Sequence, residues 1–488
     1  MIDLRQNKGF ALVFSLIFLF LIVSFMAVYI LAVASGISQA SYVANEKKSY
    51  YTAEAGLADA YELITQAGAN TVLSNNSFIP SPNTDNGYYS FGTTHGNYAV
   101  SVIYSNAPRS NYTLVYKGTY GNVSKTLQLK IMGASISKYA YWSDEEVNPS
   151  LGVLWWVGMP GLEMLTTGPV QTNGQLNIFG NPIFNSAVTE SNLPMIGNTL
   201  GSVPTSNSPN YYYGTANNPN GNGSDPAYIF KQGITNDAPP IKIPPQQTLT
   251  GIQSVANDGA GLVLTGASTV IFNPTGTISV TGTVKNANCV TTATYNNTTI
   301  AAPANGVIYV QSTNMIPKCN SNAQDGNVTV QGTVKGQLTV AADQNIDLSG
   351  SVAYNTDPRV NPNSTDMLGL VANQNITVIE ATAPAQLELS AVLVALNGSF
   401  QADNWWTYKG NATTAVMDQF GSLINFVCGA TGEMDLSGNL LGGWNQIQSY
   451  DTRLGTQAPP GFPTYVNNAG DGVYNKISIT ECVSGVCG

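Results

Sequence analysis

The sequence predicts an α+β protein that is mainly β. We expect a long N-terminal α-helix with a small antiparallel sheet, followed by a β-rich body that forms a parallel β-helix or solenoid. Three observations predict this fold. An uncharged apolar run near the N-terminus continues into helical periodicity, the next segment alternates apolar and polar residues, and later segments repeat short apolar runs that end in Gly or Asn.

The first element begins as a membrane-spanning helix. Residues 10–34 are apolar and, as a helix, would be about 37 Å long, which exceeds the roughly 30 Å hydrocarbon core of a bilayer. Arg5 and Lys8 precede this run, so the positive-inside rule places the N-terminus in the cytoplasm and the remaining chain outside. A secretory signal peptide cleaved near 34–36 is the alternative, although its apolar region would span only roughly 7–15 residues.

The helix is expected to continue beyond the bilayer. Its later apolar positions recur at helical spacing, and they are Val43, Tyr50, Ala53, Leu57, Tyr61 and Ile64. The pattern predicts one unbroken helix of about 55 residues. A helix that keeps an apolar face outside the membrane needs partners along its whole length.

Two strings in this helix resemble a known family. KGFALVFSLIFLF, followed by SYYTAEAGLADA, is similar to the N-terminus of type IV prepilins, and in particular to PilX-like and type II secretion K-like minor subunits. The resemblance implies a class III leader at 1–9 that a prepilin peptidase removes after Gly9, leaving Phe10 as a methylated N-terminal residue. Glycine suits the cut because a residue without Cβ lets the backbone approach a protease closely.

Position 14 departs from the family pattern. Major pilins usually carry a glutamate there, and the resemblance implies that this carboxylate pairs with the N-terminal amine of a neighbouring subunit inside the apolar filament core, where an unpaired charge is costly. This chain has Phe14 instead. The substitution favours a subunit at the filament tip over a repeated shaft subunit; the alternative is that Phe14 is one more apolar anchor residue.

The segments after the helix read as strands. Alternation at 98–104, 113–117 and 123–131 predicts a small antiparallel sheet packed on the exposed half of the helix. Between 260 and 400, short apolar strands recur irregularly, which predicts stacked rungs and leaves a β-sandwich as the alternative. The strings SKYAYWSDEEVN, GPVQTNGQLNIFGNPIFNSAVT and YDTRLGTQAPPGFP resemble large PilX-like proteins.

These readings divide the chain into six segments. They are the prepilin leader at 1–9, a transmembrane and amphipathic pilin helix at 10–66, a pilin-like antiparallel β domain at 67–134, an irregular β- and loop-rich region at 135–245, a β-helix-like region at 246–400 and a C-terminal β/cap region at 401–488.

Composition limits the class of protein. Only 9% of the residues are charged, whereas Gly, Asn, Thr and Ser are abundant, which is typical of secreted, turn-rich β-structure. The net charge of −10 and the 18 scattered Lys and Arg residues give no support to nucleic-acid binding. Five cysteines form no CxxC motif, so zinc and redox sites are not expected.

The cysteines allow disulfides in an oxidising compartment. Cys482 with Cys487 would close a small loop at the C-terminus, Cys289 with Cys319 would staple a larger one, and Cys428 would remain a core thiol. Buried free thiols are the alternative for all five.

No pattern indicates catalysis, a cofactor or a metal. The single histidine, His95, excludes histidine triads, and Asp144, Glu145 and Glu146 read as an exposed acidic turn more readily than as a calcium site. Carboxylates near rung ends could act in glycan cleavage, although their spacing does not separate catalytic acids from turn residues: Asp325, Asp343, Asp347 and Asp366. The candidate binding aromatics, for which core packing is the alternative, are Trp155, Trp156, Tyr211, Tyr212, Tyr213, Trp405 and Trp406.

The sequence therefore predicts a structural, non-enzymatic minor pilin or pseudopilin. We expect it in the inner membrane with an extracytoplasmic body, and then in a surface filament. Its expected partners are other major or minor pilins along the helix, the prepilin peptidase, and a surface or glycan ligand. The alternative is a membrane-anchored β-helix protein that binds or cleaves extracellular glycans.

Overall fold

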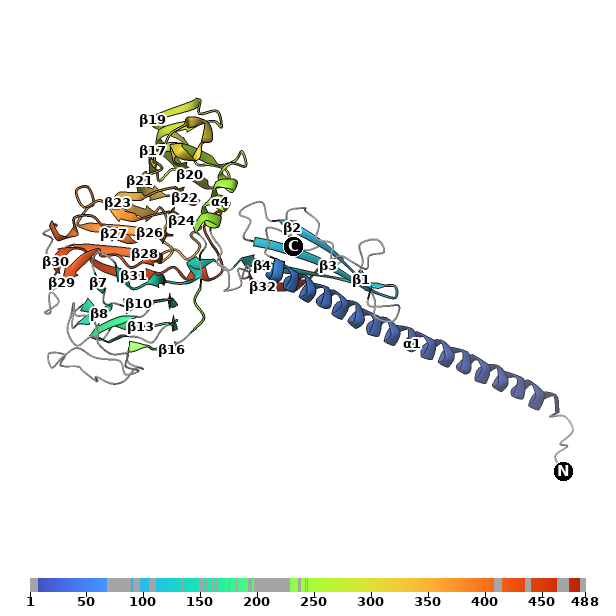
Figure 1. Ribbon diagram of the computed structural model, residues 1–488. Helices are drawn as coiled ribbons and strands as arrows, with labels where there is room; N and C mark the ends of the chain where they lie inside the picture. Colours follow the sequence, from blue (N-terminus) through green and yellow to red (C-terminus); the bar gives the residue numbers. More distant parts are fainter. Residues whose placement is uncertain are drawn as a thin grey trace. The chain divides into compact units, whose positions relative to one another are not determined.

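The structure is a computed structural model, and it divides the chain into two compact units (Figure 1). The helix–sheet unit comprises 1–103, 113–131 and 478–488, and the body comprises 104–112 and 132–477. The residues that the structure describes are 8–67, 89–90, 97–104, 111–133, 135–148, 152–153, 156–159, 162–163, 165–174, 176–180, 182–191, 195–196, 229–235, 238–241, 243, 245–407, 415–434, 440–462 and 474–482.

The helix–sheet unit begins with α1, which spans Lys8–Ala67 as one continuous 60-residue helix. No proline interrupts this range, which explains why the helix has no break. The stretch Phe10–Ala58 is long and apolar enough to cross a membrane, by length and composition. The predicted long helix is therefore confirmed.

The small sheet has the strand order β1-β2-β3-β4-β32. Its strands are β1 Tyr89–Ser90, β2 Asn97–Tyr104, β3 Asn111–Tyr120, β4 Val123–Gly133 and β32 Tyr474–Glu481. The predicted strands after the helix are present, and β1 pairs with β2 in the antiparallel sense. The last strand was expected in the C-terminal cap region; instead it lies beside β4, so the body is an insertion between two adjacent strands of this sheet.

The second half of α1 packs closely on this sheet. Ser49 and Ala53 are fully buried, and Leu57 is nearly so. A Cβ on Gly118 of β3 would lie 2.3 Å from the Ser49 carbonyl oxygen and 2.4 Å from the Ala53 nitrogen. Because no side chain fits there, Gly118 sets the short distance between helix and sheet.

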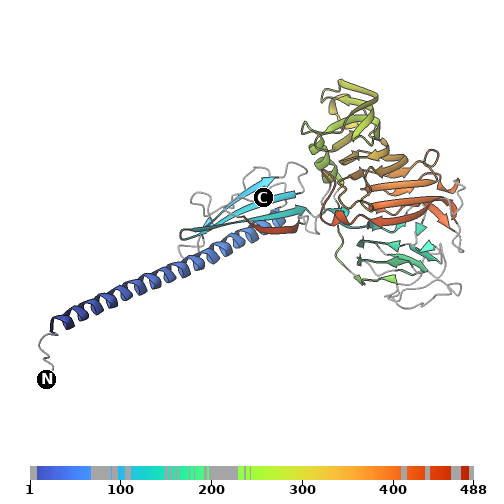
Figure 2. The same ribbon diagram turned by 180° about the vertical axis from the view of Figure 1, so that it is seen from behind.

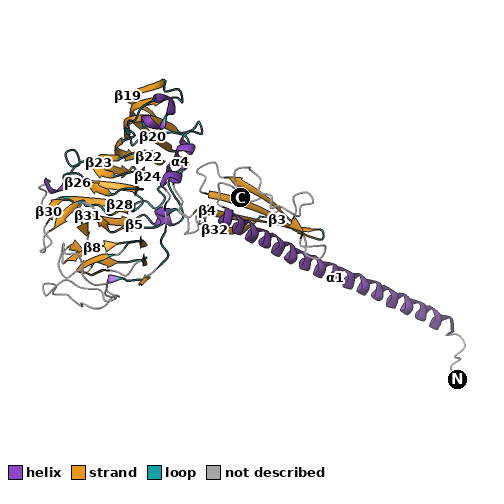
Figure 3. Ribbon diagram, in the orientation of Figure 1, coloured by secondary structure: helices purple, strands orange, loops and turns teal. Residues whose placement is uncertain are grey.

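The body is β-rich, and the α-helix that the structure describes in it is α4 Pro245–Ala256 (Figure 3). Its first strands are β5 Tyr141–Glu145, β6 Val147–Asn148, β7 Gly152–Val153, β8 Trp156–Met159, β9 Leu162–Glu163, β10 Leu165–Thr166, β11 Val170–Thr172, β12 Asn177–Gly180, β13 Ile183–Phe184, β14 Val188–Glu190, β15 Met195–Ile196 and β16 Ile234–Thr235. The strands after α4 are β17 Leu262–Phe272, β18 Thr277–Lys285, β19 Thr291–Ala301, β20 Val307–Gln311, β21 Val328–Val334, β22 Gln337–Ala342, β23 Ile346–Tyr354, β24 Met367–Ala372, β25 Ile376–Val378, β26 Gln386–Ala395, β27 Phe400–Ala402, β28 Val416–Val427, β29 Gly432–Met434, β30 Leu440–Gly443 and β31 Asn445–Tyr450.

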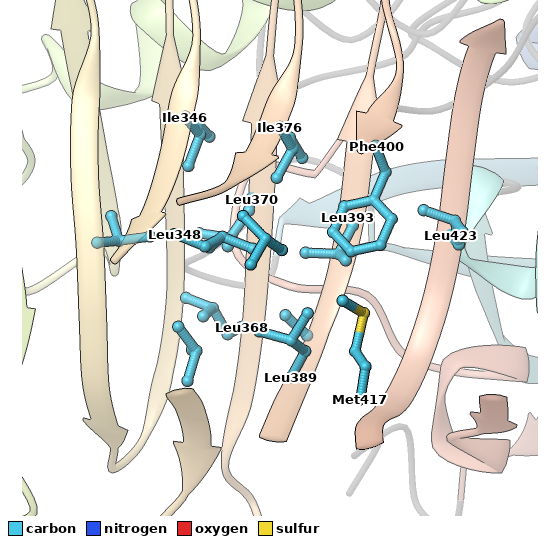
Figure 4. Close-up of a cluster of buried hydrophobic side chains, with 14 of the residues drawn as sticks. Ile346, Leu348, Leu368, Leu370, Ile376, Leu389, Leu393, Phe400, Met417 and Leu423 are labelled. Carbon is cyan, nitrogen blue, oxygen red and sulfur yellow. The ribbon is translucent and has the colours of Figure 1, made fainter. Parts of the chain in front are cut away.

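Most of these strands stack in parallel as the rungs of a solenoid. One ladder runs from β17 through β20, β22, β24 and β26 to β28, and a second runs from β17 through β21, β23 and β25 to β27. Leucine and isoleucine side chains from successive rungs meet inside, as Leu348, Leu370 and Leu393 show in Figure 4. The parallel pairing confirms the solenoid and excludes the β-sandwich alternative.

Asparagine side chains line one turn of the solenoid. The amide oxygen of Asn327 accepts the backbone N–H of Asn345 at 3.0 Å, and Asn345 accepts that of Asn375 at 3.0 Å. Asn375 in turn accepts the backbone N–H of Ser399 at 2.9 Å. Each asparagine lies directly before a strand and satisfies a backbone N–H of the next rung, which explains the asparagines at these turns.

The order of the rungs differs from the order of the chain. The last long strand, β28, pairs in parallel with β5, and the stack continues through β11 and β14 to β16. The region 135–245, which we expected to be irregular and rich in β-structure and loops, contains these further rungs. The β17–β19 hairpin strands lie at one end of the body and β16 at the other (Figures 1 and 2).

Candidate functional site

The exposed half of α1 is the most unusual surface of the described structure. From Phe10 to Val43 its large apolar side chains are uncovered, with exposed fractions of 39% or more. The exposed residues lie all around the helix rather than along one stripe, as expected where a helix is surrounded by lipid or by other helices. This surface can bind apolar partners, and it carries no group for chemistry.

The predicted processing residues lie at the start of this helix. Gly9 and Phe10 fall in its first turn, and Phe10 is 67% exposed. Phe14 is 62% exposed, and its ring centroid is 5.5 Å from that of Phe10. Position 14 therefore presents a second aromatic ring beside that of Phe10.

The packed half of α1 is held by polar contacts as well as by close packing. The Ser49 hydroxyl donates to the carbonyl of Val123 at 2.7 Å and accepts from the N–H of Tyr120 at 3.1 Å. The Lys125 ammonium bonds to Glu46 of α1 at 2.5 Å and to Glu481 of β32 at 2.6 Å. These hydrogen bonds, that to Glu46 first, hold the pKa of Lys125 above its ordinary value.

Only part of the predicted aromatic set is available to a ligand. Trp155, Tyr211, Tyr212 and Tyr213 lie outside the described residues. The prediction is wrong for Trp156, which is 5% exposed and packs against Tyr141 and Phe184 with ring centroids 4.8 and 5.1 Å away.

The second tryptophan pair differs between its members. Trp405 is half-buried and packs against the solenoid core, whereas Trp406 is 61% exposed. Their ring centroids lie 5.7 Å apart in an edge-to-face arrangement. Trp406 is therefore the described member of the predicted set that offers a free ring face to a ligand.

Three of the four rung-end carboxylates hold the backbone of turns. Asp343 accepts the N–H of Ser312 at 2.7 Å, Asp325 accepts that of Thr313 at 2.7 Å, and Asp366 accepts that of Gly336 at 2.7 Å. Such bonds cap turns, which gives these three carboxylates a structural role. Asp347 differs, because burial and the nearby Asp403 carboxylate raise its pKa.

We expected the acidic triplet Asp144, Glu145 and Glu146 to form one exposed turn, and it does not. Glu145 is exposed and Asp144 half-buried, but Glu146 is 2% exposed. The Ser143 hydroxyl donates a short hydrogen bond to the Glu146 carboxyl, and Tyr141 donates a longer one at 3.5 Å. Burial raises the pKa of Glu146. Within the described residues, no group of three or more His, Cys, Asp or Glu side chains is arranged to hold a metal ion.

The cysteines fall into bonded and free classes. Cys289 and Cys319 form a disulfide with Cα atoms 4.9 Å apart, which ties the turn after β18 to the short helix at Pro317–Cys319. Cys482 is disulfide-bonded, while its predicted partner Cys487 lies outside the described residues, as does His95. Cys428 is a free thiol beside Tyr141 and Glu146, and burial raises its pKa to about 12.

Sequence reasoning missed two features that the structure brings together. Gly118 gave no signal because a lone glycine in an alternating strand does not reveal which backbone approaches it. The pairing of Lys125 with Glu481 joins residues 356 positions apart, which local patterns do not reveal. Tyr42 and Tyr51, 58% and 65% exposed, were visible as aromatic residues on the long helix, but their exposure was not predictable.

Comparison with known proteins gives little direct guidance. No protein-family model matches the chain, and no curated protein matches it. Among solved structures, the crystal structure of the competence-associated pilin ComZ from Thermus thermophilus is similar at 13% identity, covering 90% of this chain and 97% of that chain, with a TM-score of 0.32. A TM-score of this size does not establish a shared fold.

Proposed function

We propose that this chain is a structural, non-enzymatic subunit of a type IV filament system, a minor pilin or pseudopilin. In this role α1 anchors the chain in the inner membrane and then packs against the helices of other pilins, while the solenoid is displayed outside. The proposal rests on the uncovered apolar surface of α1 and on the resemblance of its sequence to prepilin helices.

The length of the exposed surface carries the argument. About 20 helical residues cross a bilayer, so a span that begins at Phe10 ends near Ile30. Ile37, Tyr42 and Val43 lie about 10 to 20 Å farther along the axis, and they are 66%, 58% and 48% exposed. Uncovered apolar surface outside the membrane is unfavourable in water, so covering these residues with a protein partner would be favourable. Another pilin helix is the partner that fits a long apolar rod.

Two finer proposals concern the N-terminus and the position in the filament. We propose that a prepilin peptidase cuts after Gly9 and that Phe10 becomes the methylated first residue. Phe14 cannot neutralise the amine of a neighbouring subunit, which supports a place at the tip, where priming, adhesion or secretion would use the body.

Photo-crosslinking tests the partner. A photoreactive residue at position 37 or 42 of the full chain in its native membrane should form crosslinks to other pilins. Position 360 is the control, because Val360 is 84% exposed but lies in a loop of the body. Crosslinks at 360 alone, or crosslinks at 37 and 42 that reach lipid and no protein, would contradict the proposed packing.

A second candidate function is glycan binding by the body, and exposed Trp406 favours it. An aromatic face stacks on the apolar face of a sugar ring. Glycan cleavage has less support, since three of the four candidate acids cap turns. A glycan array probed with the full chain and with Trp406→Ala tests this function: binding lost in the variant supports it, and no binding by either protein contradicts it.

A further inference from the structure

The outer face of the second ladder carries a continuous row of polar side chains. Thr269 of β17 lies beside Thr329 of β21, and the row continues in register, rung by rung, through Asp347, Thr377 and Gln401. Each of these residues is half-buried and stands between two buried neighbours, so its side chain points away from the solenoid core. We call these residues the polar row. At about 4.8 Å between neighbouring strands, it spans about 19 Å.

The hydrogen-bonding groups of the polar row are not used to hold the solenoid together. The asparagines two positions before its members do hold it, because the amide oxygens of Asn327, Asn345 and Asn375 accept backbone N–H groups of the next rung. Within the part of the chain that the structure describes, the side chains of the polar row form no hydrogen bond. Their hydroxyl, amide and carboxyl groups are therefore available to a ligand.

The chemistry of these groups indicates the class of ligand. Threonine hydroxyls and the glutamine amide both donate and accept hydrogen bonds, which suits a ligand rich in hydroxyl groups. The charged member of the row is the acid Asp347, and no Lys or Arg belongs to it, so the row does not suit the phosphates of a nucleic acid. The row also contains no aromatic or large apolar side chain to anchor a protein partner. A neutral glycan is the class that fits.

An exposed aromatic ring belongs to the turn beside the end of the polar row. Gln401 is the last member of the row, and the short helix Trp405–Thr407 follows it in the chain. Asp403, which lies between them, is close enough to Asp347 for its charge to raise the pKa of Asp347. The turn therefore adjoins the row. Trp406 in this turn is 61% exposed, and such a ring stacks on the apolar face of a sugar.

We propose that an extended chain of neutral sugars binds across the rungs along the polar row, with Trp406 stacking on a sugar ring beyond Gln401. This inference rests on the second candidate function, glycan binding by the body, and adds the class of glycan, its direction across the strands and the residues that bind it. Successive rungs offer polar groups at a repeat of about 4.8 Å, so a linear ligand gains contacts with every rung that it covers. Affinity should therefore rise with chain length until the ligand covers the row.

Isothermal titration calorimetry of the full chain, in a detergent without sugar head groups, tests the proposal. The probes are oligosaccharides of increasing length derived from cellulose, mannan and chitin. Thr329→Val and Thr377→Val each replace a hydroxyl of the polar row by a methyl group of similar size, and each should weaken binding by about two- to tenfold. Thr294→Val is the matched control, because Thr294 is exposed on β19 outside the polar row, and it should leave the affinity unchanged.

The outcomes separate the polar row from the function on which it rests. If Trp406→Ala abolishes binding while Thr329→Val and Thr377→Val leave it unchanged, glycan binding stands and the polar row is refuted. If no oligosaccharide binds the wild type, both are refuted, and the proposed role of α1 in a filament is unaffected. Should the valine variants fail to fold, the wild type alone decides: affinity that rises with chain length supports the polar row, and affinity independent of length refutes it.

Discussion

Replacing Gly118 by alanine places a methyl group where α1 touches the small sheet. The new Cβ would lie 2.3 Å from the carbonyl oxygen of Ser49 and 2.4 Å from the nitrogen of Ala53, both backbone atoms that cannot rotate away. Ordinary contact begins near 3.4 Å, so the helix would have to retreat by about 1 Å. Overpacking of this kind costs about 1–3 kcal/mol. The retreat would also weaken the Ser49–Val123 hydrogen bond, which contributes about 1 kcal/mol.

We therefore expect Gly118→Ala to lower the free energy of unfolding of the helix–sheet unit by about 3 kcal/mol. The assay is protease resistance of the full chain in detergent at increasing denaturant concentration. Peptides of β3 report on the helix–sheet unit, and peptides of β24 report on the body. Gly36→Ala is the matched control, because a Cβ at Gly36 meets no atom within 4 Å. It should leave stability unchanged or raise it by up to about 1 kcal/mol through helix propensity. Equal stability of Gly118→Ala and wild type would refute the close packing of α1 on β3.

Two further predictions concern the body. Asn345→Ala leaves the N–H of Asn375 without its partner and should destabilise the solenoid by about 1–3 kcal/mol in denaturant unfolding. Asn322→Ala, an exposed control, should have no effect. Equal effects of the two substitutions would contradict a stabilising role for the asparagine hydrogen bonds between rungs. Cys319→Ser removes a crosslink between residues 30 positions apart and should lower the free energy of unfolding by about 3 kcal/mol. The loss should appear as faster proteolysis near β18 and β19. Reducing the disulfide of the wild type should have the same effect. Unchanged proteolysis in both cases would show that the disulfide does not hold the hairpin.

Local patterns were sufficient for the long helix, for three strands of the small sheet and for the stacked rungs of the body. The uncharged run from Gly9 to Asn45 and the helical spacing of apolar residues after it predict a continuous helix, and alternation at β2, β3 and β4 predicts their strands. The irregular rhythm of apolar runs predicts stacked rungs, because each run ends where an asparagine or glycine turns the chain. These features depend on neighbours within a few residues.

Partners that lie far apart in the sequence could not be predicted. β32 completes a sheet whose other strands lie near the N-terminus, and its Glu481 bonds to Lys125 across 356 positions. In the body, the Ser422 hydroxyl of β28 donates to the carbonyl of Tyr139 across 283 positions. No spacing in the sequence encodes such partners, so the region 135–245 read as irregular although it contains rungs.

The expected exposure of Trp156 and Glu146 was wrong for a related reason. Trp156 and Glu146 look like surface residues when their neighbours are ignored, since aromatic pairs and acidic triplets are common in exposed turns. Both become buried because β8 and β5 belong to rungs that pack against core residues elsewhere in the chain. Trp406 shows the opposite outcome, because its half-buried neighbour Trp405 packs against the core while Trp406 stays exposed.

Mass spectrometry of the N-terminal peptide, taken from the chain isolated from its native membranes and filaments, tests the central proposal most directly. The account predicts a chain that begins at Phe10 with a methylated amino group, and its recovery together with other pilins. An intact Met1 on a chain that is recovered alone in the membrane would contradict it.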